Sequence, residues 1–296
     1  MSVKKSSGDL AFDVCNYIFM ILLIIIMLYP MLNVLAISMS SSSAISGGRV
    51  TWYPIEINFK GYSYILSQPM LYRGYINSIF YAITTTILML IVTSLAAYAL
   101  SVKDFALKKF FTIFLAITMF FGGGMIPTYL LIKNLNMINT MWVMIIPGCV
   151  SAWNVIVFRT FFQQIPNELR ESAFIDGATE FTIWRKIIIP LSKPLLATFG
   201  LFSIVGSWNS WFNALLYLKD ENLYPIQMFL RRMVVDGSLN SAYGNSQLST
   251  LLNSGKVNPQ NIQMAVVVLT MLPILMIYPF VQKHFVKGVM IGAIKG

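Results

Sequence analysis

Charged residues are scarce in this sequence, and their scarcity excludes an ordinary soluble domain. Asp, Glu, Lys and Arg make up 11% of the 296 residues, whereas hydrophobic residues make up 57%. The mean hydropathy is +0.70, which is too apolar for a chain that folds in water. A lipid bilayer is the solvent that suits this composition. We therefore predict an all-α integral membrane protein.

Cysteine and histidine are also rare, which argues against a catalytic or metal-binding chain. Cys15 and Cys149 fall in or beside apolar segments, where a disulfide framework has no role, so we expect both to be small core residues. The one histidine, His284, has no paired carboxylates near it in the sequence. A membrane enzyme would need a nucleophile, an acid–base pair or a metal cluster. We predict no enzyme, no catalytic residue, and no metal or cofactor bound by this chain.

Two further absences bear on the energy source. The phosphate-binding pattern G-x-x-x-x-G-K-[ST] does not occur, so energy from ATP must come through another subunit. An Asp, Glu, Lys or Arg within a membrane span is the usual sign of proton or sodium coupling. Six apolar windows of this sequence contain none of these residues. An ion-coupled secondary transporter is therefore a less favoured alternative, although sodium sites built from carbonyls and hydroxyls stay open.

Each of the six windows is long enough to cross about 30 Å of hydrocarbon as a helix. The first apolar core exceeds the roughly 7 to 15 residues of a signal-peptide core, so we interpret it as a retained helix. Gly237–Gly255 is also free of charge, but its Ser, Asn and Gly content argues against a span. The prediction is one transmembrane domain over residues 1–296, with spans at 14–36, 77–100, 110–131, 138–158, 195–216 and 264–279.

The basic residues predict the orientation, since Lys and Arg in short loops resist translocation. One side of the membrane collects 13 of the 21 basic residues, and we assign it to the cytoplasm. Both termini and the loop 166–193 then face the cytoplasm, while the loops 38–76 and 219–262 are extracellular. The net charge of +10 follows from this distribution and requires no nucleic acid partner.

The stretch Glu168–Pro194 is a charged, glycine-broken run between two apolar segments. Asn167 is a good N-cap residue and carboxylates follow it, which predicts a short helix from Glu168 to about Ile175. Asp176-Gly177 is a turn signal, because glycine readily takes positive φ. A second helix should begin near Thr179.

Pro190 is expected to end this second helix as the chain returns to the membrane. The two short helices would form a knob with a surface of small and aromatic side chains, which are Ala173, Phe174, Ala178 and Phe181. Charged side chains surround that surface, namely Arg170, Glu171 and Glu180. Such a knob suits docking of a helix into a hydrophobic groove of a partner.

This stretch resembles the EAA loop of permease subunits in bacterial ATP-binding-cassette (ABC) importers. The matching residues are Glu171, Ala173, Asp176, Gly177, Ala178, Ile187 and Pro190, with 13 positions from Gly177 to Pro190. Ser172, Trp184 and Ile189 stand where the family commonly has Ala, Phe and Leu. In that family the loop docks in a cleft of the ATPase. The resemblance implies a type I ABC importer permease fold of six transmembrane helices, with a cytoplasmic coupling-helix loop and coupling residues Glu171, Ser172, Ala173, Phe174, Asp176, Gly177, Ala178, Phe181 and Pro190.

Other segments look like the carbohydrate-uptake branch of that family, the group of the smaller maltose-transporter permease. They are Asn77–Ser101, Ile126–Gly148, Phe158–Pro166 and Val286–Gly296. Within the branch, the stretch Gly122–Pro127 is similar to permeases for oligosaccharides and polysaccharide fragments. The resemblance therefore implies uptake of such glycans, with a permease for an amino acid or a peptide as the alternative.

The resemblance also implies partners, because six helices enclose only half of a pathway. They are a second permease subunit, two copies of an ABC ATPase that bind ATP and magnesium, and an extracellular solute-binding protein. The C-terminal residues Lys287, Gly288, Lys295 and Gly296 would insert between the ATPases. The alternative is a frayed basic terminus.

An aromatic and amide cluster in the outer half of the fifth span is a possible substrate path. Its members are Trp208, Asn209, Trp211, Phe212 and Asn213. Aromatic faces stack on sugar rings and amides satisfy sugar hydroxyls. An interfacial aromatic belt or helix packing is the favoured alternative. The three glycines at 122–124 are expected to allow close helix packing or a kink.

Overall fold

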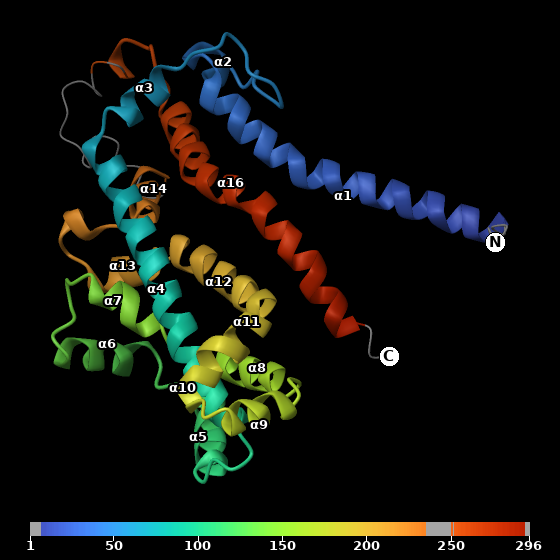
Figure 1. Cartoon of the computed structure of the whole chain (residues 1–296). Helices are drawn as coiled ribbons and strands as arrows, with labels where there is room; N and C mark the ends of the chain where they lie inside the picture. The colour runs from blue at the N-terminus through green and yellow to red at the C-terminus, as the bar shows by residue number, and fades with distance from the viewer. Residues whose placement is uncertain (1–6, 235–249, 251, 294–296) are drawn as a thin grey trace. The chain divides into compact units, whose positions relative to one another are not determined.

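The computed structural model describes residues 7–234, 250 and 252–293, and all regular structure in this part of the chain is helical (Figure 1). These residues form two compact units. The first comprises Met1–Pro69 and Leu230–Leu272, and the second comprises Met70–Phe229 and Pro273–Gly296.

The helices have the following bounds. In the first unit they are α1 (Ser7–Met39), α2 (Ser42–Ser46), α3 (Lys60–Leu66) and the start of α16 (Pro259–Ala293). In the second unit they are α4 (Pro69–Ser101, from Met70 on), α5 (Lys108–Phe120), α6 (Met125–Asn134), α7 (Trp142–Ile145), η1 (Ile146–Gly148), α8 (Ala152–Phe162), α9 (Glu168–Ile175), α10 (Glu180–Ile183), η2 (Trp184–Ile188), α11 (Ile189–Leu191), α12 (Lys193–Trp208), α13 (Phe212–Tyr217) and η3 (Glu221–Leu223). The helix α14 (Ile226–Val234) crosses the boundary.

Three of the described helices are long and apolar enough to cross a membrane unbroken. They are Gly8–Met39, Pro69–Ser101 and Pro259–Ile277. The apolar window of α1 is 0% buried, so nothing in the described part of this chain covers it. Cys15 accordingly lies exposed on α1, so the prediction of a core cysteine is wrong there, whereas Cys149 is buried as expected.

Three further candidate spans are bent pairs of helices, which bring the number of candidates to as many as six. The predicted span 110–131 is wrong as one continuous helix, because α5 and α6 meet at an angle of 119°. The chain breaks at Phe121–Gly124, where Gly124 has φ +81. A β-carbon on Gly122 or Gly124 would meet nothing within 4 Å, so close packing within this chain does not require glycine there, whereas the positive φ of Gly124 favours it.

The fifth predicted span, 195–216, is also interrupted. The helix α12 ends at Trp208, and α13 begins only at Phe212. Asn209 and Ser210 stand in the break, and such short polar residues compete with helical hydrogen bonding. Part of the predicted fourth span is likewise bent, by 44° between Trp142–Gly148 and α8.

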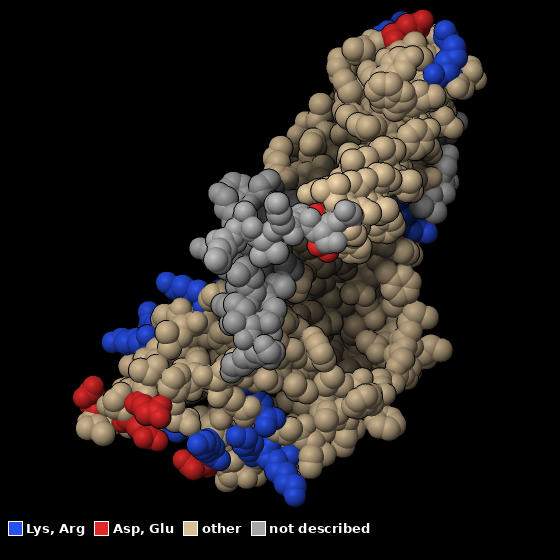
Figure 2. Space-filling view, turned by 90° about the vertical axis from the view of Figure 1, so that its right-hand side faces the viewer, with Lys and Arg blue, Asp and Glu red and all other residues tan. Residues whose placement is uncertain are grey.

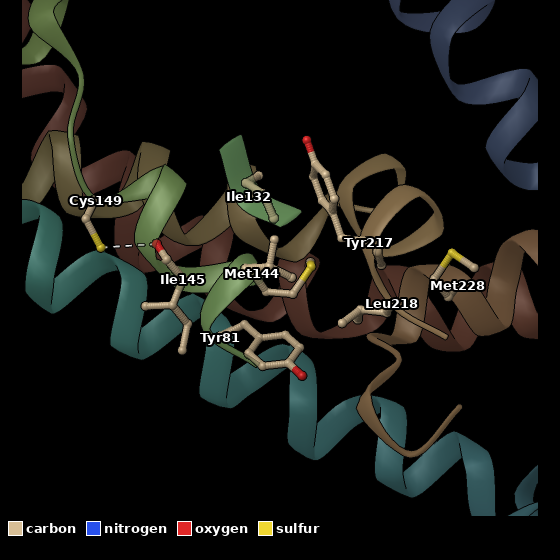
Figure 3. Packing of buried hydrophobic residues seen from close by; sticks show 10 residues of the cluster. Tyr81, Ile132, Met144, Ile145, Cys149, Tyr217, Leu218 and Met228 are labelled. Atoms are coloured by element: carbon tan, nitrogen blue, oxygen red, sulfur yellow. Dashed lines mark hydrogen bonds between the residues drawn. The ribbon is translucent and has the colours of Figure 1, made fainter. Parts of the chain in front are cut away.

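A core cluster in the second unit packs α4 against the broken helices (Figure 3). Tyr81 of α4 lies beside Met144 and Ile145 of α7, with Leu218 just after α13 completing the same cluster. The thiol of Cys149 donates a hydrogen bond to the carbonyl of Ile145. These contacts explain why short helical pieces hold their places without being continuous spans.

In the first unit a buried amide fastens the end of α1 to the start of α16. Asn261 is 1% exposed, and its Nδ2 donates to the carbonyls of Ile37 (3.1 Å), Ser38 (2.8 Å) and Ser40 (3.3 Å). The last carbonyls of a helix have no partner within it, so this amide satisfies them. Gly61 of α3 packs directly on the same side chain.

The contact between Gly61 and Asn261 gives a testable prediction. A β-carbon at Gly61 would lie 2.0 Å from Asn261 Oδ1. Because overpacking a filled site costs about 1 to 3 kcal/mol, Gly61→Ala should lower the thermal unfolding temperature of the purified protein in detergent. Gly206→Ala is the matched control, since a β-carbon there meets nothing within 4 Å. Equal unfolding temperatures for the two variants would contradict the tight contact.

Candidate functional site

The candidate site is the segment that joins α8 to α12, here called the α9–α11 segment (residues 168–191). Its first helix, α9, spans Glu168–Ile175 as the sequence predicts. Asn167 occupies the cap position, but its side chain makes no capping hydrogen bond, so that part of the prediction is wrong. The Asn167 carbonyl instead accepts from the N–H groups of Arg170 (2.9 Å) and Glu171 (3.0 Å), so the backbone begins the helix without a side-chain cap.

The turn between α9 and α10 also agrees with the sequence. Gly177 has φ +79, in the left-handed region that favours glycine. Its N–H donates to the carbonyl of Phe174, and the N–H of Ala178 donates to that of Ala173, both at 2.9 Å. Thr179 then caps α10, because its side chain accepts from the backbone N–H of Thr182. The two short helices are therefore fixed by local hydrogen bonds.

The prediction that Pro190 ends the second helix is wrong by position. The helix continues through a π segment, Trp184–Ile188, and then through α11 to Leu191. A proline within a helix clashes with the carbonyl four residues earlier, and a wider π turn immediately upstream relieves such crowding. The sharp change of direction comes at Ser192, where Glu180–Leu191 and α12 meet at 82°.

The exposed surface of the segment differs from the predicted one at its two alanines, Ala173 and Ala178. Phe174 and Phe181 are 41% and 58% exposed, and Glu171 is also exposed. Ala173 is buried in a core cluster shared with α4 and α8, so it anchors α9 and does not belong to the docking surface. Ser172, Asp176, Gly177 and Pro190 are exposed, and Ala178 is partly buried.

One prominent residue of this surface was missed from sequence. Ile175 is 87% exposed at the end of α9. It stands four residues after Glu171, so both side chains lie on the same face of the helix. That spacing is the signal that could have found it.

Two charged groups of the segment, Arg170 and Glu180, form an ion pair. Arg170 Nη2 lies 2.5 Å from Glu180 Oε1, and the guanidinium stands 4.8 Å from the ring centre of Phe174. Tyr98 of α4 donates a short hydrogen bond to the other oxygen of Glu180. The sequence placed Arg170 and Glu180 as separate charges around a surface, whereas the structure brings them together.

These partners set the ionisation of Glu180. Burial acts to raise the pKa of Glu180, but hydrogen bonds from Arg170 and Tyr98, with the charge of Arg170, outweigh it and leave the pKa below its ordinary value. The pKa of Arg170 is raised, chiefly by its hydrogen bond to Glu180. Glu180 is therefore ionised at neutral pH, and the pair weakens only as the pH falls through this lowered pKa.

Hollows flank the segment on two sides. One, of about 490 Å³, is lined by residues of α4, of the loop after α4 and of the segment, among them Tyr98, Phe105, Glu180, Phe181 and Trp184. Another, of about 380 Å³, is lined by Ser172, Asp176, Ile187, Pro190 and others. On the face that Figure 2 shows, charged side chains gather at the lower edge, where Figure 1 places α5, α9 and α10. The segment thus combines a charged surface with concave, largely apolar surroundings.

The predicted substrate path is divided by the break after α12. Trp208 is 4% exposed and packs against Tyr75 of α4 at 6.0 Å between ring centres, as the packing interpretation expects. Trp211 and Phe212 are 42% and 47% exposed. Asn209 and Asn213 are exposed as well. The four exposed members stay candidates for contact with a solute.

Other predicted residues fall where the structure says little. Lys287 and Gly288 lie on α16, in a stretch whose side chains are not described, and Lys295 and Gly296 lie outside the described residues. Within the described part of the chain, no three His, Cys, Asp or Glu residues are grouped so that they could hold a metal ion.

The chain combines apolar helices that suit a bilayer with a charged two-helix segment. This combination is typical of the membrane-spanning subunit of a transporter. The chain belongs to the family of binding-protein-dependent transport system inner membrane components, whose model matches residues 104–291. The family predicted from the Glu168–Pro194 stretch is therefore confirmed.

Sequence similarity to known proteins extends over almost the whole chain. Protein LplC of Bacillus subtilis (strain 168) is 39% identical over 296 residues, which cover 100% of this chain and 98% of that protein. The polygalacturonan/rhamnogalacturonan transport system permease protein YtcP of the same organism is 37% identical over 286 residues, with 96% and 98% covered.

A solved structure has the same fold. It is the crystal structure of a bacterial ABC transporter involved in the import of the acidic polysaccharide alginate, and one of its chains matches with a TM-score of 0.91 and 31% identity. The match covers 96% of this chain and 100% of that one. The predicted type I ABC importer permease fold is confirmed by this likeness.

Proposed function

We propose that this chain is the permease subunit of an ABC importer that takes up oligosaccharides or polysaccharide fragments. The observation that carries the proposal is full-length similarity to YtcP, named for polygalacturonan and rhamnogalacturonan transport, at 37% identity. The likeness to a chain of the alginate importer supports the same class of cargo. Both names refer to acidic polysaccharides, so uronic-acid oligomers are the first solutes to test.

The subunit acts with partners that supply energy and cargo. The family description includes dependence on a binding protein, which supports an extracellular solute-binding protein as one partner. The chain has no G-x-x-x-x-G-K-[ST] pattern, so two ABC ATPases would bind ATP and magnesium and hydrolyse the nucleotide. A second permease subunit would complete the pathway.

In this proposal the α9–α11 segment is the docking element for an ATPase. Its exposed Glu171, Ile175 and Phe181 offer one carboxylate and two apolar side chains, which suits a groove with a polar rim. Buried Ala173 and the hydrogen bond from Tyr98 to Glu180 hold the segment on the helices behind it, and the Arg170–Glu180 pair joins α9 to α10. The bias of basic residues supports a cytoplasmic position for this segment and both termini.

Uptake by cells tests the proposed cargo. Cells that lack the gene should lose accumulation of labelled galacturonic-acid oligomers, and the intact gene should restore it. Glu171→Ala should restore it poorly at equal membrane levels, whereas Gln164→Ala, at an exposed position just before the segment, should restore it fully. The alternative substrate class would be favoured if cells without the gene accumulated every glycan normally but no longer accumulated an amino acid or a peptide.

A further inference from the structure

The long helix α4 makes specific contacts at both of its ends within the second unit. Near its C-terminal end, the hydroxyl of Tyr98 donates to Glu180 of α10. The ring of Tyr98 is 7% exposed and packs in the cluster that contains Ile183 of α10.

Near its N-terminal end, α4 holds the stretch 219–226, which contains η3 and the first residue of α14. The side chains that do so are Arg73, Asn77, Ser78 and Tyr81. Asn77 Nδ2 donates to the carbonyls of Asn222 (2.7 Å) and Tyr224 (3.0 Å). Tyr81 donates to the carbonyl of Leu223 (2.9 Å), and Ser78 Oγ accepts from the N–H of Ile226 (2.8 Å). Arg73, Asn77 and Tyr81 recur every four residues, so one face of α4 carries most of this connection.

The helix between these two sets of contacts is unbroken. Residues 82–97 contain neither proline nor glycine, which are the common causes of a helix kink. From Asn77 to Tyr98 the helix rises about 30 Å. A displacement imposed at one end is therefore transmitted along the helix and not absorbed within it.

We infer that Tyr98 is a positioning residue that makes α4 move together with the α9–α11 segment, so that α4 carries this movement to the stretch 219–226. The inference rests on the proposed function, because the movement is the one that an ATPase would impose on the segment. Glu180 is well suited to accept the hydrogen bond from Tyr98. Its carboxylate is fixed on the other side by Arg170, so the Tyr98 hydroxyl meets an acceptor already held in place.

The test uses the complete assembly with its ATPases, second permease and binding protein, reconstituted in lipid. Tyr98→Phe keeps the buried ring and deletes the hydroxyl. We expect the ratio of solute-stimulated to basal ATP hydrolysis to fall on the order of tenfold, the size expected for loss of a hydrogen bond to a charged group. Basal hydrolysis and assembly yield should stay unchanged.

Three further variants separate positioning from a merely structural role. Glu180→Gln keeps an acceptor for Tyr98, so its stimulation ratio should stay above that of Tyr98→Phe. Tyr53→Phe deletes a hydroxyl from an exposed tyrosine outside α4 and should behave as the unmodified protein. Adding Tyr81→Phe to Tyr98→Phe should lower the ratio little further, because both changes interrupt one connection.

The inference is overturned if Tyr98→Phe keeps the full stimulation ratio, or if it loses stimulation only in proportion to lost assembly. Independent, multiplying losses in the Tyr81 and Tyr98 double variant would contradict transmission through α4. Failure of the proposed function has a different signature. An unmodified assembly stimulated by a peptide and by no glycan would refute the carbohydrate cargo, and the Tyr98 comparison would then be made with that peptide.

Discussion

Gly177→Pro should abolish solute uptake while leaving the subunit in the membrane. Gly177 has φ +79, whereas the proline ring fixes φ near −65°. The change also removes the N–H that donates to Phe174 at 2.9 Å. These losses cost about 3 kcal/mol or more, enough to displace α9 from α10 and reduce uptake at least roughly a hundredfold.

Gly177→Asn is the matched control for this change. Asparagine tolerates the left-handed conformation better than other non-glycine residues and keeps its N–H. Uptake of labelled oligosaccharide should therefore stay within a few-fold of the unmodified protein. Equal uptake by the proline variant at equal membrane levels would show that the α9–α10 turn has no part in transport.

Ile175→Asp should separate the ATPase from the membrane subunits without unfolding this chain. Ile175 is 87% exposed, so its replacement removes almost no internal packing. In the proposed complex the same side chain enters an apolar groove, where a carboxylate would be buried without a partner. Loss of a central interface residue costs about 2 kcal/mol or more, so ATPase binding should weaken by roughly thirtyfold or more.

Binding of the purified ATPase to permease subunits in lipid nanodiscs measures this effect directly. Gln164→Asp adds the same charge at an exposed position outside the α9–α11 segment and should bind ATPase normally. Unchanged affinity for Ile175→Asp would place the docking surface elsewhere on the chain.

Local features of the candidate site could be predicted from sequence because they depend on neighbours in the chain. The positive φ of Gly177, the bounds of α9 and the cap at Thr179 follow from turn and capping preferences within a few residues. The broken third span is a partial case. The glycines at 122–124 signalled a kink, but nothing local gave its angle of 119°.

Features that depend on distant contacts could not be predicted in this way. Tyr98 and Glu180 are 82 residues apart, and no periodic pattern links them. Ala173 looks like a surface alanine in sequence, and its burial is decided by packing against α4 and α8. Cys15 was predicted to be a core residue but is exposed. An apolar segment of a membrane protein can face lipid instead of a protein core, and its sequence does not distinguish the two.

ATP hydrolysis by the purified assembly is the most direct test of the central claim, that this chain couples glycan delivery to partner ATPases. The unmodified assembly, with its loaded binding protein, should hydrolyse ATP faster with oligosaccharide than without it. The Gly177→Pro assembly should show no such increase. Stimulation by oligosaccharide that survives Gly177→Pro undiminished, or no stimulation of the unmodified assembly by any glycan, would contradict the account.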